Sequence, residues 1–202
     1  MSLTLRFLGT SASRPTVERN VSSIAVIREG ETLMFDCGEG TQRQMMRYGI
    51  SFALSDIFFT HMHADHILGV IGLLRTLALQ GRTELMNLYG PAGSEKILWR
   101  AINLGSEKQH FEIKVHEVAP DTPLKRRGYS IIPFAVEHGD RSAIGYQIAE
   151  SVRLHQRLTG KAQLDKVIDS LRRVRVPSPE GRTRDYPHQF SGGMCQRVMI
   201  AM

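Results

Sequence analysis

The sequence predicts a layered α/β or α+β domain, followed near Glu150 by a smaller and mainly helical segment. Short apolar runs bounded by Gly, Pro, Asp or Ser recur along residues 1–150, which is typical of strands. Longer stretches between them carry apolar residues three and four positions apart, which favours amphipathic helices. A length of 202 residues suits one domain or one and a half.

We expect eight strands in the first part of the chain. They cover residues 3–9, 22–29, 32–37, 56–61, 86–90, 111–118, 129–138 and 143–149. The amphipathic helices are expected over residues 41–49, 65–81 and 94–105. Because strands dominate and helices lie between them, we expect helices packed outside one or two sheets.

The formal net charge of +6 lies entirely in the last quarter of the chain. Residues 1–150 carry 16 Lys and Arg against 16 Asp and Glu, whereas residues 151–202 carry 10 against 4. Residues 161–176 predict a basic amphipathic helix, 176–189 a Pro-rich loop and 192–202 the start of another helix. Such asymmetry is typical of a basic tail, or of a second piece of protein with its own ancestry.

Several protein classes are excluded by simple features. The longest apolar stretch, residues 67–79, contains Arg75, Thr76 and two glycines, so no membrane span is predicted. The first residues lack a secretory signal pattern, and we therefore expect a cytoplasmic protein. Cys37 and Cys195 lie far apart without metal or redox spacing, which predicts free thiols.

The strongest chemical signal is the H-x-H-x-D-H pattern of His61, His63, Asp65 and His66, directly after an apolar strand. Imidazoles two positions apart on an extended turn can share one zinc ion, and the Asp–His pair can reach a second. Two such ions, about 4 Å apart, can clamp a phosphate and activate water. The pattern therefore predicts hydrolysis, with a metal-free polar turn as the alternative.

A distant donor is needed to complete the first zinc site, and His138 is the best candidate. It ends an expected strand and lies beside Gly139, where a loop ligand belongs. A histidine at a strand end is more often solvated or capped, so the residues alone leave its role open. His110 and His116 have no partner motif and are expected at the surface.

Five motifs in order give residues 1–150 a resemblance to ribonuclease Z, a branch of the metallo-β-lactamase superfamily. They are LRFLGTSASRPTVERNVSSIAV, FDCGEGTQRQMMRYG, FFTHMHADHILGVIGLL, LYGPAG and HGDRSAIGYQI. The FDCGEGTQRQ run and the H-G-x-x-x-x-x-G-Y run around His138 and Tyr146 indicate the nuclease branch. The resemblance implies the front part of an αββα sandwich, two zinc ions, and removal of the 3′ trailer from precursor tRNA.

The same resemblance assigns roles to individual residues. It places His61, His63 and His138 on one zinc, and Asp65 and His66 on the other, with Asp65 also the general base. It implies precursor tRNA as the substrate partner and a homodimeric assembly. For Asp36, at the end of an expected strand, support of the metal loop and a plain turn role are equally open.

The sequence departs from the ribonuclease Z pattern after Glu150. An arm that grips tRNA, an Asp that bridges both ions and a final His on the second ion are all missing. The second site then keeps two ligands, fewer than a zinc site usually needs. Alternative donors further along the chain are His155, Asp165, Asp169, Asp185 and His188.

From about Val152 onward the chain resembles the helical region and signature motif of ATP-binding subunits of oligopeptide and dipeptide ABC importers. Ser191, Gly192 and Gly193 match the signature loop, where a helix start can face a phosphate. The resemblance implies nucleotide binding with an importer partner, because this chain contains no phosphate loop of its own. We therefore expect incomplete fragments of two proteins, residues 1–150 and 151–202.

The function that the sequence favours is a zinc-dependent tRNA 3′ endoribonuclease that acts through metal-bound hydroxide, impaired by the missing parts. One alternative is an importer ATPase fragment that binds ATP together with a partner. Another is a nonfunctional fusion that binds at most one zinc ion.

Overall fold

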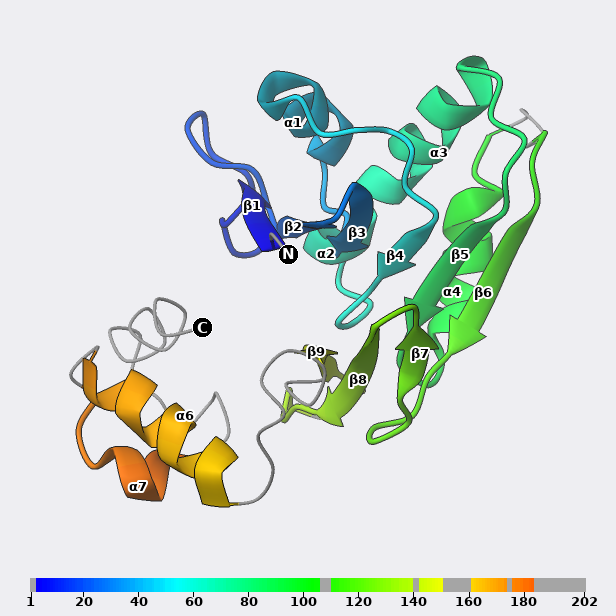
Figure 1. Cartoon of the computed structure of the whole chain (residues 1–202). Helices are drawn as coiled ribbons and strands as arrows, with labels where there is room; N and C mark the ends of the chain where they lie inside the picture. Colours follow the sequence, from blue (N-terminus) through cyan, green and yellow to red (C-terminus); the bar gives the residue numbers. More distant parts are fainter. Residues whose placement is uncertain (1–2, 106–109, 140–141, 151–160, 174–175, 184–202) are drawn as a thin grey trace. The chain divides into compact units, whose positions relative to one another are not determined.

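The computed structural model describes residues 3–105, 110–139, 142–150, 161–173 and 176–183 (Figure 1). The chain divides into two compact units, Met1–Ala149 and Glu150–Met202. This division does not bear on the ancestry of either unit. The predicted junction between two protein families therefore stays a prediction.

The first unit is built around a six-stranded sheet with the strands in chain order. The strands are β1 (Leu3–Gly9), β2 (Ser23–Arg28), β3 (Glu31–Phe35), β4 (Asp56–Phe58), β5 (Met86–Gly90) and β6 (Ile113–Glu117). The first three are antiparallel neighbours and the remaining pairs are parallel. Glu29 and Gly30 make the tight β2–β3 turn with positive φ angles of 49° and 88°, the backbone that two-residue hairpins favour.

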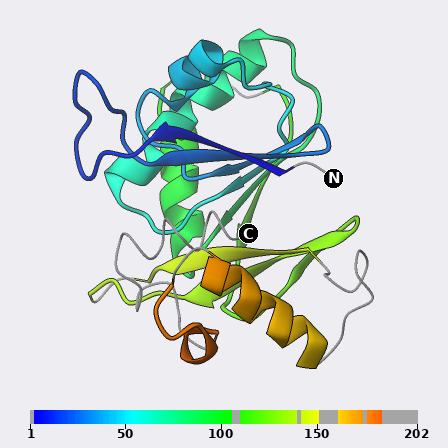
Figure 2. The ribbon, with the colours of Figure 1, turned by 60° about the vertical axis from the view of Figure 1, so that its left-hand side comes forward.

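Helices cover one face of this sheet (Figure 2). They are α1 (Thr41–Tyr48), α2 (Ala64–Ile67), α3 (Gly69–Leu79) and α4 (Ser94–Ile102). Alternate strand residues point into this layer and make the main core with the helices, because side chains along a strand face opposite sides. Its fully buried members include Ala25, Met34, Ile57, Leu88, Leu73, Leu74 and Leu98.

A second, three-stranded sheet faces the opposite side of the first sheet. Its strands are β7 (Leu124–Arg126), β8 (Tyr129–Ala135) and β9 (Ile144–Glu150). The residues between the two sheets form a second apolar core that includes Val26, Leu33, Phe58, Tyr89, Ile131 and Ile144. In the part of the first unit that is described, helices lie over one sheet only, which gives three of the four layers of an αββα sandwich.

The structure of the first unit differs from the expected elements in two places. Strand β7 was not predicted, because three residues of mixed polarity give no periodic signal. The single helix expected over residues 65–81 is interrupted at Leu68. There the Gly69 N–H donates to the Cys37 carbonyl at 2.9 Å, and a Cβ on Gly69 would lie 1.9 Å from the Gly38 oxygen. Close backbone packing, rather than helix periodicity, decides this boundary.

The described residues of the second unit contain two helices, α6 (Lys161–Arg173) and α7 (Pro179–Arg182). Helix α6 lies within residues 161–176, where a basic amphipathic helix was predicted, and an ion pair joins Arg173 to Asp169 one turn away at 2.9 Å. Helix α7 lies inside the segment expected to be a loop, so that prediction was wrong for these four residues. No helix in the described ranges is long and apolar enough to cross a membrane.

Candidate metal centre

Three histidines from two distant parts of the sequence bring their ring nitrogens together. His61 and His63 lie between β4 and α2, and His138 follows β8. The Nε2 of His61 lies 3.0 Å from Nδ1 of His63, and the Nε2 of His138 lies 3.2 Å from the same atom. One nitrogen of each ring lies within 4.8 Å of the other two. This arrangement places the three histidines predicted for the first zinc in one cluster.

The geometry of this cluster fits a zinc ion. Nitrogen ligands about 2.05 Å from a tetrahedral zinc are about 3.3 Å apart, close to the two distances above. The Nε2 atoms of His61 and His138 both face Nδ1 of His63, and this atom carries either a single proton or a single lone pair. Hydrogen bonds cannot satisfy both contacts well, whereas a cation between the three rings can.

The charge state of His61 suits metal binding. Burial, and then the nearby His66, lowers the pKa of His61 to about 4. Its imidazole is therefore neutral at pH 7, which is the form that binds metal ions. The other ring nitrogen, Nδ1, lies 3.0 Å from the Thr60 hydroxyl. With the proton on Nδ1 donated to this hydroxyl, the Nε2 lone pair points at the cluster.

His66 and Asp65 form a second group beside the first. The His66 Nδ1 lies 2.6 Å from the Asp36 carboxylate, and its Nε2 lies 3.5 Å from Oδ2 of Asp65. The rings of His61 and His66 are 4.0 Å apart between centroids. The structure thus brings together all five predicted ligands, and this second group supplies two of them.

The carboxylate and imidazole of this second group have shifted pKa values. Burial opposes ionisation of Asp65, but a hydrogen bond of 2.8 Å from the Ser13 N–H and the nearby His66 lower its pKa overall. Burial likewise works against a charged His66, yet its bond to Asp36 raises its pKa. The pair therefore stabilises opposite charges, and a metal bound at the Nε2 of His66 would replace the proton there.

Asp36 bonds to residues of both groups, as expected for the first of the two roles left open for it, support of the metal loop. It is buried at the end of β3, and its carboxylate accepts bonds from the Thr60 N–H at 2.8 Å and the Thr60 hydroxyl at 3.0 Å. It also binds His66 and, at 3.2 Å, the Ser22 hydroxyl. Its φ of 57° lies in the left-handed region, a conformation that Asp tolerates better than most residues.

Sequence reasoning missed Thr60 and Ser13, which position the predicted ligands. Thr60 directly precedes the H-x-H-x-D-H motif, and that adjacency was the available signal. Ser13 reaches Asp65 across 52 sequence positions through its backbone, so its side chain left no trace in the pattern. Tyr146 ends the H-G-x-x-x-x-x-G-Y run that begins at His138. Its hydroxyl donates to the Phe59 carbonyl at 3.0 Å and so connects β9 to the segment that precedes the metal ligands.

Other predicted or alternative donors lie elsewhere. His116 contacts the Asn87 side chain at 3.0 Å and stacks on Tyr89, away from the cluster. Asp165 and Asp169 belong to α6 in the second unit, whose position relative to the first is not described. His155, Asp185, His188, Ser191, Gly192 and Gly193 lie outside the described residues.

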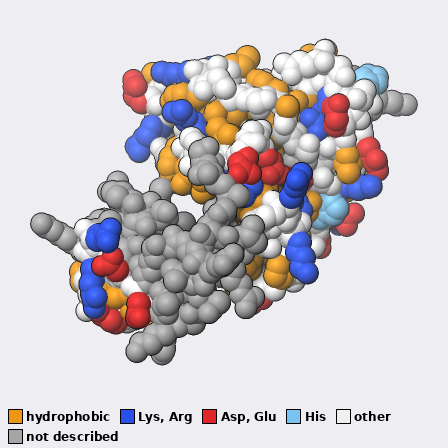
Figure 3. All heavy atoms as spheres, viewed as in Figure 1, with side chains coloured by type: hydrophobic (Ala, Val, Ile, Leu, Met, Phe, Trp, Pro, Cys, Tyr) orange, Lys and Arg blue, Asp and Glu red, His pale blue; other side chains and the backbone are white. Residues whose placement is uncertain are grey.

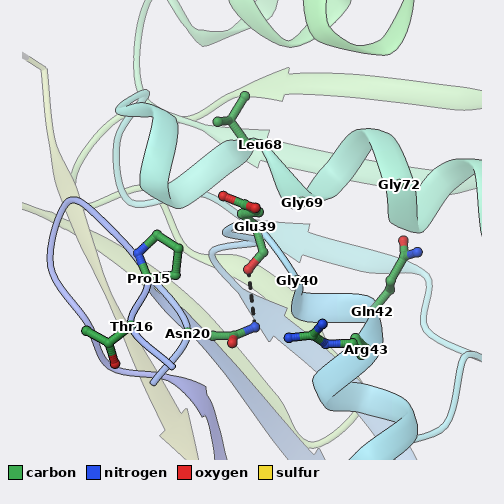
Figure 4. Close-up of a pocket in the computed structure, with 10 residues that line it drawn as sticks. All are labelled: Pro15, Thr16, Asn20, Glu39, Gly40, Gln42, Arg43, Leu68, Gly69 and Gly72. Atoms are coloured by element: carbon green, nitrogen blue, oxygen red, sulfur yellow. Dashed lines mark hydrogen bonds between the residues drawn. The ribbon is translucent and has the colours of Figure 1, made fainter. Parts of the chain in front are cut away.

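A pocket of about 500 Å³ lies between the loop of Pro15 to Asn20, the start of α1 and the α2–α3 junction, and none of the predicted ligands lines it (Figure 4). Arg43 and Gln42 reach it from the first turn of α1, and Leu68 lies at the junction of α2 and α3. Asn20 donates to the Glu39 carbonyl at 3.3 Å across its floor. The volume is in the range of pockets that hold small molecules.

Two facing sheets, a helical layer and a histidine cluster at the strand ends are features of the metallo-β-lactamase fold, and the similarities that follow make this protein ribonuclease Z-like. The short form of human tRNase Z is 31% identical, with a TM-score of 0.66 over 74% of this chain and 66% of that one. Ribonuclease Z of Gemmatimonas aurantiaca is 58% identical over 154 residues, which cover 76% of this chain and 49% of that protein. A family model described as anti-Pycsar protein Apyc1 matches residues 3–159, and the chain belongs to this family.

The chain spans about half the length of the curated relatives it matches. Ribonuclease Z of Acaryochloris marina is 38% identical over 193 residues, covering 89% of this chain and 60% of that protein. This match and the family model both extend past Glu150, where the junction was predicted. Neither the described residues nor these comparisons support the resemblance of residues 152–202 to ABC importer subunits.

Proposed function

We propose that this protein is a metal-dependent phosphodiester hydrolase of the ribonuclease Z type. The observation that carries the proposal is the convergence of His61, His63 and His138 beside the His66–Asp65 pair. Two adjacent groups of nitrogen and carboxylate donors suit two divalent ions that share one phosphate. Four of the donors also follow the carboxyl end of β4, which is parallel to both of its neighbours, and α/β proteins place their active sites at such strand ends.

Each residue has a distinct part in this proposal. His61, His63 and His138 would hold one zinc ion, and His66 and Asp65 a second. The bound ions would supply Lewis acidity and activate water for attack at phosphorus. Asp65 would take the proton from the attacking water, and Thr60 and Asp36 would keep the imidazoles in the tautomers that face the site.

The proposed substrate is precursor tRNA, cleaved to remove its 3′ trailer. Two observations support this substrate. Relatives that are up to 58% identical over this chain's first unit are named ribonuclease Z, and the fold is similar to that of the short form of human tRNase Z. A homodimer is the proposed assembly, on the resemblance alone.

A cyclic nucleotide is the second candidate substrate. The matched family model is that of an anti-Pycsar protein, a type that degrades cyclic nucleotides. The same two groups of donors could clamp a cyclic phosphodiester as readily as a linear one. The pocket of about 500 Å³ that Leu68 and Gly69 help to line, shortly after the H-x-H-x-D-H motif, is large enough for a single nucleotide.

In the test, the purified full chain is loaded with zinc and incubated with a precursor tRNA that carries a 3′ trailer. In a separate assay it is incubated with 3′,5′-cyclic mononucleotides. Trailer release that His63→Ala abolishes and His110→Ala leaves intact would support the first substrate. Hydrolysis of a cyclic nucleotide that His63→Ala abolishes and His110→Ala leaves intact would support the cyclic nucleotide as the substrate instead. No turnover of either substrate by zinc-loaded protein would contradict the hydrolase proposal for this chain.

A further inference from the structure

The pocket at the start of α1 contains a buried polar atom that has no hydrogen-bond partner. The Oε1 atom of Gln42 accepts no hydrogen bond from the described residues. This oxygen faces Gly72, where an added Cβ would lie 2.7 Å from it, and glycine has no side-chain donor to offer. Leaving a buried acceptor unpaired is unfavourable, and such an atom beside a pocket points to a ligand.

The amide of Gln42 can reach a ligand without any movement of the backbone. Gln42 lines the pocket together with Arg43, and Figure 4 shows both side chains on the side opposite Pro15. The last side-chain torsion of glutamine is broad, so the amide can turn from Gly72 toward the pocket. There it offers an acceptor and a donor side by side. A ligand edge with a donor next to an acceptor would pair with both.

The chemistry of the lining residues matches the three parts of a nucleotide. The amide of Gln42 suits the N6 donor and N7 acceptor of adenine, a pairing that glutamine makes in nucleic-acid recognition. Arg43 is exposed, and a guanidinium binds two phosphate oxygens at once. The carboxylate of Glu39 can accept hydrogen bonds from ribose hydroxyls, as acidic residues do in dinucleotide sites. Pro15 and Leu68 add apolar surface for the faces of the base.

The floor of this pocket is held in place before any ligand binds. Gly40 has a φ of 78°, and a Cβ there would lie 2.4 Å from Nδ2 of Asn20, which favours glycine. The same Asn20 amide donates to the Glu39 carbonyl at 3.3 Å. The Thr41 hydroxyl donates to the Gly38 carbonyl at 2.7 Å. A fixed floor lowers the cost of ordering the site when a ligand binds.

Two walls of the pocket continue segments that build the metal centre. Ser13, whose N–H donates to Asp65 at 2.8 Å, precedes Pro15 by two positions. Leu68 follows His66 by two positions. The pocket and the metal centre are therefore built on the same short stretches of chain. A nucleotide in the pocket would be a close neighbour of a phosphate at the metal centre.

Exposed arginines lie on the segments on either side of the pocket. In residues 13–20 and 39–48 they are Arg14, Arg19, Arg43 and Arg47, against the acidic residues Glu18 and Glu39. Figure 3 shows several Lys and Arg side chains on the visible face near β1 and α1. Such a surface attracts the phosphates that flank a nucleotide within an RNA strand. It favours a nucleotide in a strand over a free one.

We propose that this pocket binds one adenine nucleotide of the RNA substrate, beside the phosphodiester at the metal centre. Gln42 pairs with the base, Glu39 with the ribose and Arg43 with a phosphate. The inference rests on the proposed function for its RNA partner. The affinity of the pocket for a nucleotide is nevertheless measurable without hydrolysis.

The test titrates adenosine 5′-monophosphate into the full chain by calorimetry, with a chelator present so that no metal ion binds the phosphate. Gln42→Leu should weaken binding at least about tenfold, since it removes the bidentate pairing with the base. The matched control Gln80→Leu makes the same change at an exposed position outside the pocket and should bind like the wild type. Ribose 5-phosphate, which has no base, should bind equally to all three proteins. Circular dichroism establishes that the variants are folded.

Competition with RNA tests the partner. A short single-stranded oligoadenylate should displace the bound nucleotide from the wild type, and Arg43→Ala should weaken its binding about tenfold. No binding of the mononucleotide by the wild type, or equal binding by Gln42→Leu and Gln80→Leu, would overturn the proposal. An RNA that leaves the mononucleotide in place would overturn it as a substrate site.

Failure of the pocket and failure of the hydrolase give different results. A chain that binds the mononucleotide through Gln42 but cleaves neither proposed substrate when loaded with zinc would contradict the hydrolase and support the pocket. A chain that cleaves a substrate but binds no mononucleotide would contradict the pocket alone.

Discussion

Two clusters of polar side chains in the described part of the first unit include histidine, and they are built in opposite ways. The Asp56 cluster, formed by Asp56, Asn87, His116 and Arg126, matches donors with acceptors throughout. Asn87 donates to Asp56 at 3.0 Å and contacts the His116 ring at 3.0 Å, and Arg126 donates to Asp56 and Tyr89. The metal centre instead turns three imidazole nitrogens toward one point.

This difference separates a structural cluster from a site that needs a ligand. A cluster whose groups satisfy one another has nothing left to bind, and it stabilises the fold where it stands. A set of lone pairs facing a common point gains its stability only from a cation. Histidine content therefore says little by itself, whereas the match between donors and acceptors distinguishes the two cases.

The largest expected effect is loss of zinc from a variant of the metal centre. Replacing His138 with alanine removes one of three ligands of the first ion, so zinc affinity should fall by more than about 100-fold. His116→Ala, in the Asp56 cluster, should leave zinc affinity unchanged. Competition with a chromophoric chelator measures both, and equal zinc loss in the two variants would remove the distinction between the clusters.

For the stability of the metal-free protein we expect the opposite order, with the larger effect from a change in the Asp56 cluster. Asp56 is 11% and Arg126 22% exposed, so Asp56→Ala leaves a largely buried guanidinium without its carboxylate. We expect a loss of about 3 kcal/mol in the free energy of unfolding. Urea denaturation of the metal-free protein measures it, with Lys114→Ala at an exposed ion pair as the control. A loss below about 1 kcal/mol would mean that the Asp56 cluster contributes little to the fold.

Asp36 tests whether support of the ligands matters as well as the ligands themselves. Asp36→Asn keeps the size of the side chain but weakens its bonds to His66 and Thr60. Zinc affinity should fall about 10- to 100-fold, as is usual for residues that orient a metal ligand. Isothermal titration with zinc measures this, and an unchanged affinity would return Asp36 to a plain turn role.

The smallest expected effect concerns the link between the second sheet and the metal loop. Tyr146→Phe removes the hydroxyl that donates to the Phe59 carbonyl and leaves the ring packing in place. Stability should fall by about 1 kcal/mol, the net value of one hydrogen bond. Thermal denaturation of the metal-free protein measures it. A loss several times larger would show that this bond holds β9, and with it the loop of His138, against the first sheet.

The separate parts of the candidate site were predictable to different degrees. His61, His63, Asp65 and His66 followed from their spacing alone, because a short turn after a strand brings close residues to one place. His138 needed the family resemblance, since a single histidine at a strand end has no pattern. The ligand roles themselves stay predictions until zinc binding is measured.

The fold shows the same division. All eight expected strands are found in the two sheets, as β1 to β6, β8 and β9, whereas strand β7 and the break at Leu68 were missed. The segment after Glu150 was the least predictable part, and its assignment to an importer subunit has no support.

The sequence by itself determined where most strands and helices form and which short turn carries the predicted metal ligands, because hydrophobic periodicity and ligand spacing are local properties. The tertiary structure alone decided that Thr60, Asp36 and Ser13 hold those ligands, since these contacts join residues up to 52 positions apart. It also decided that Leu5 and Phe7 stay exposed, because a side chain's burial depends on what the rest of the fold places over it.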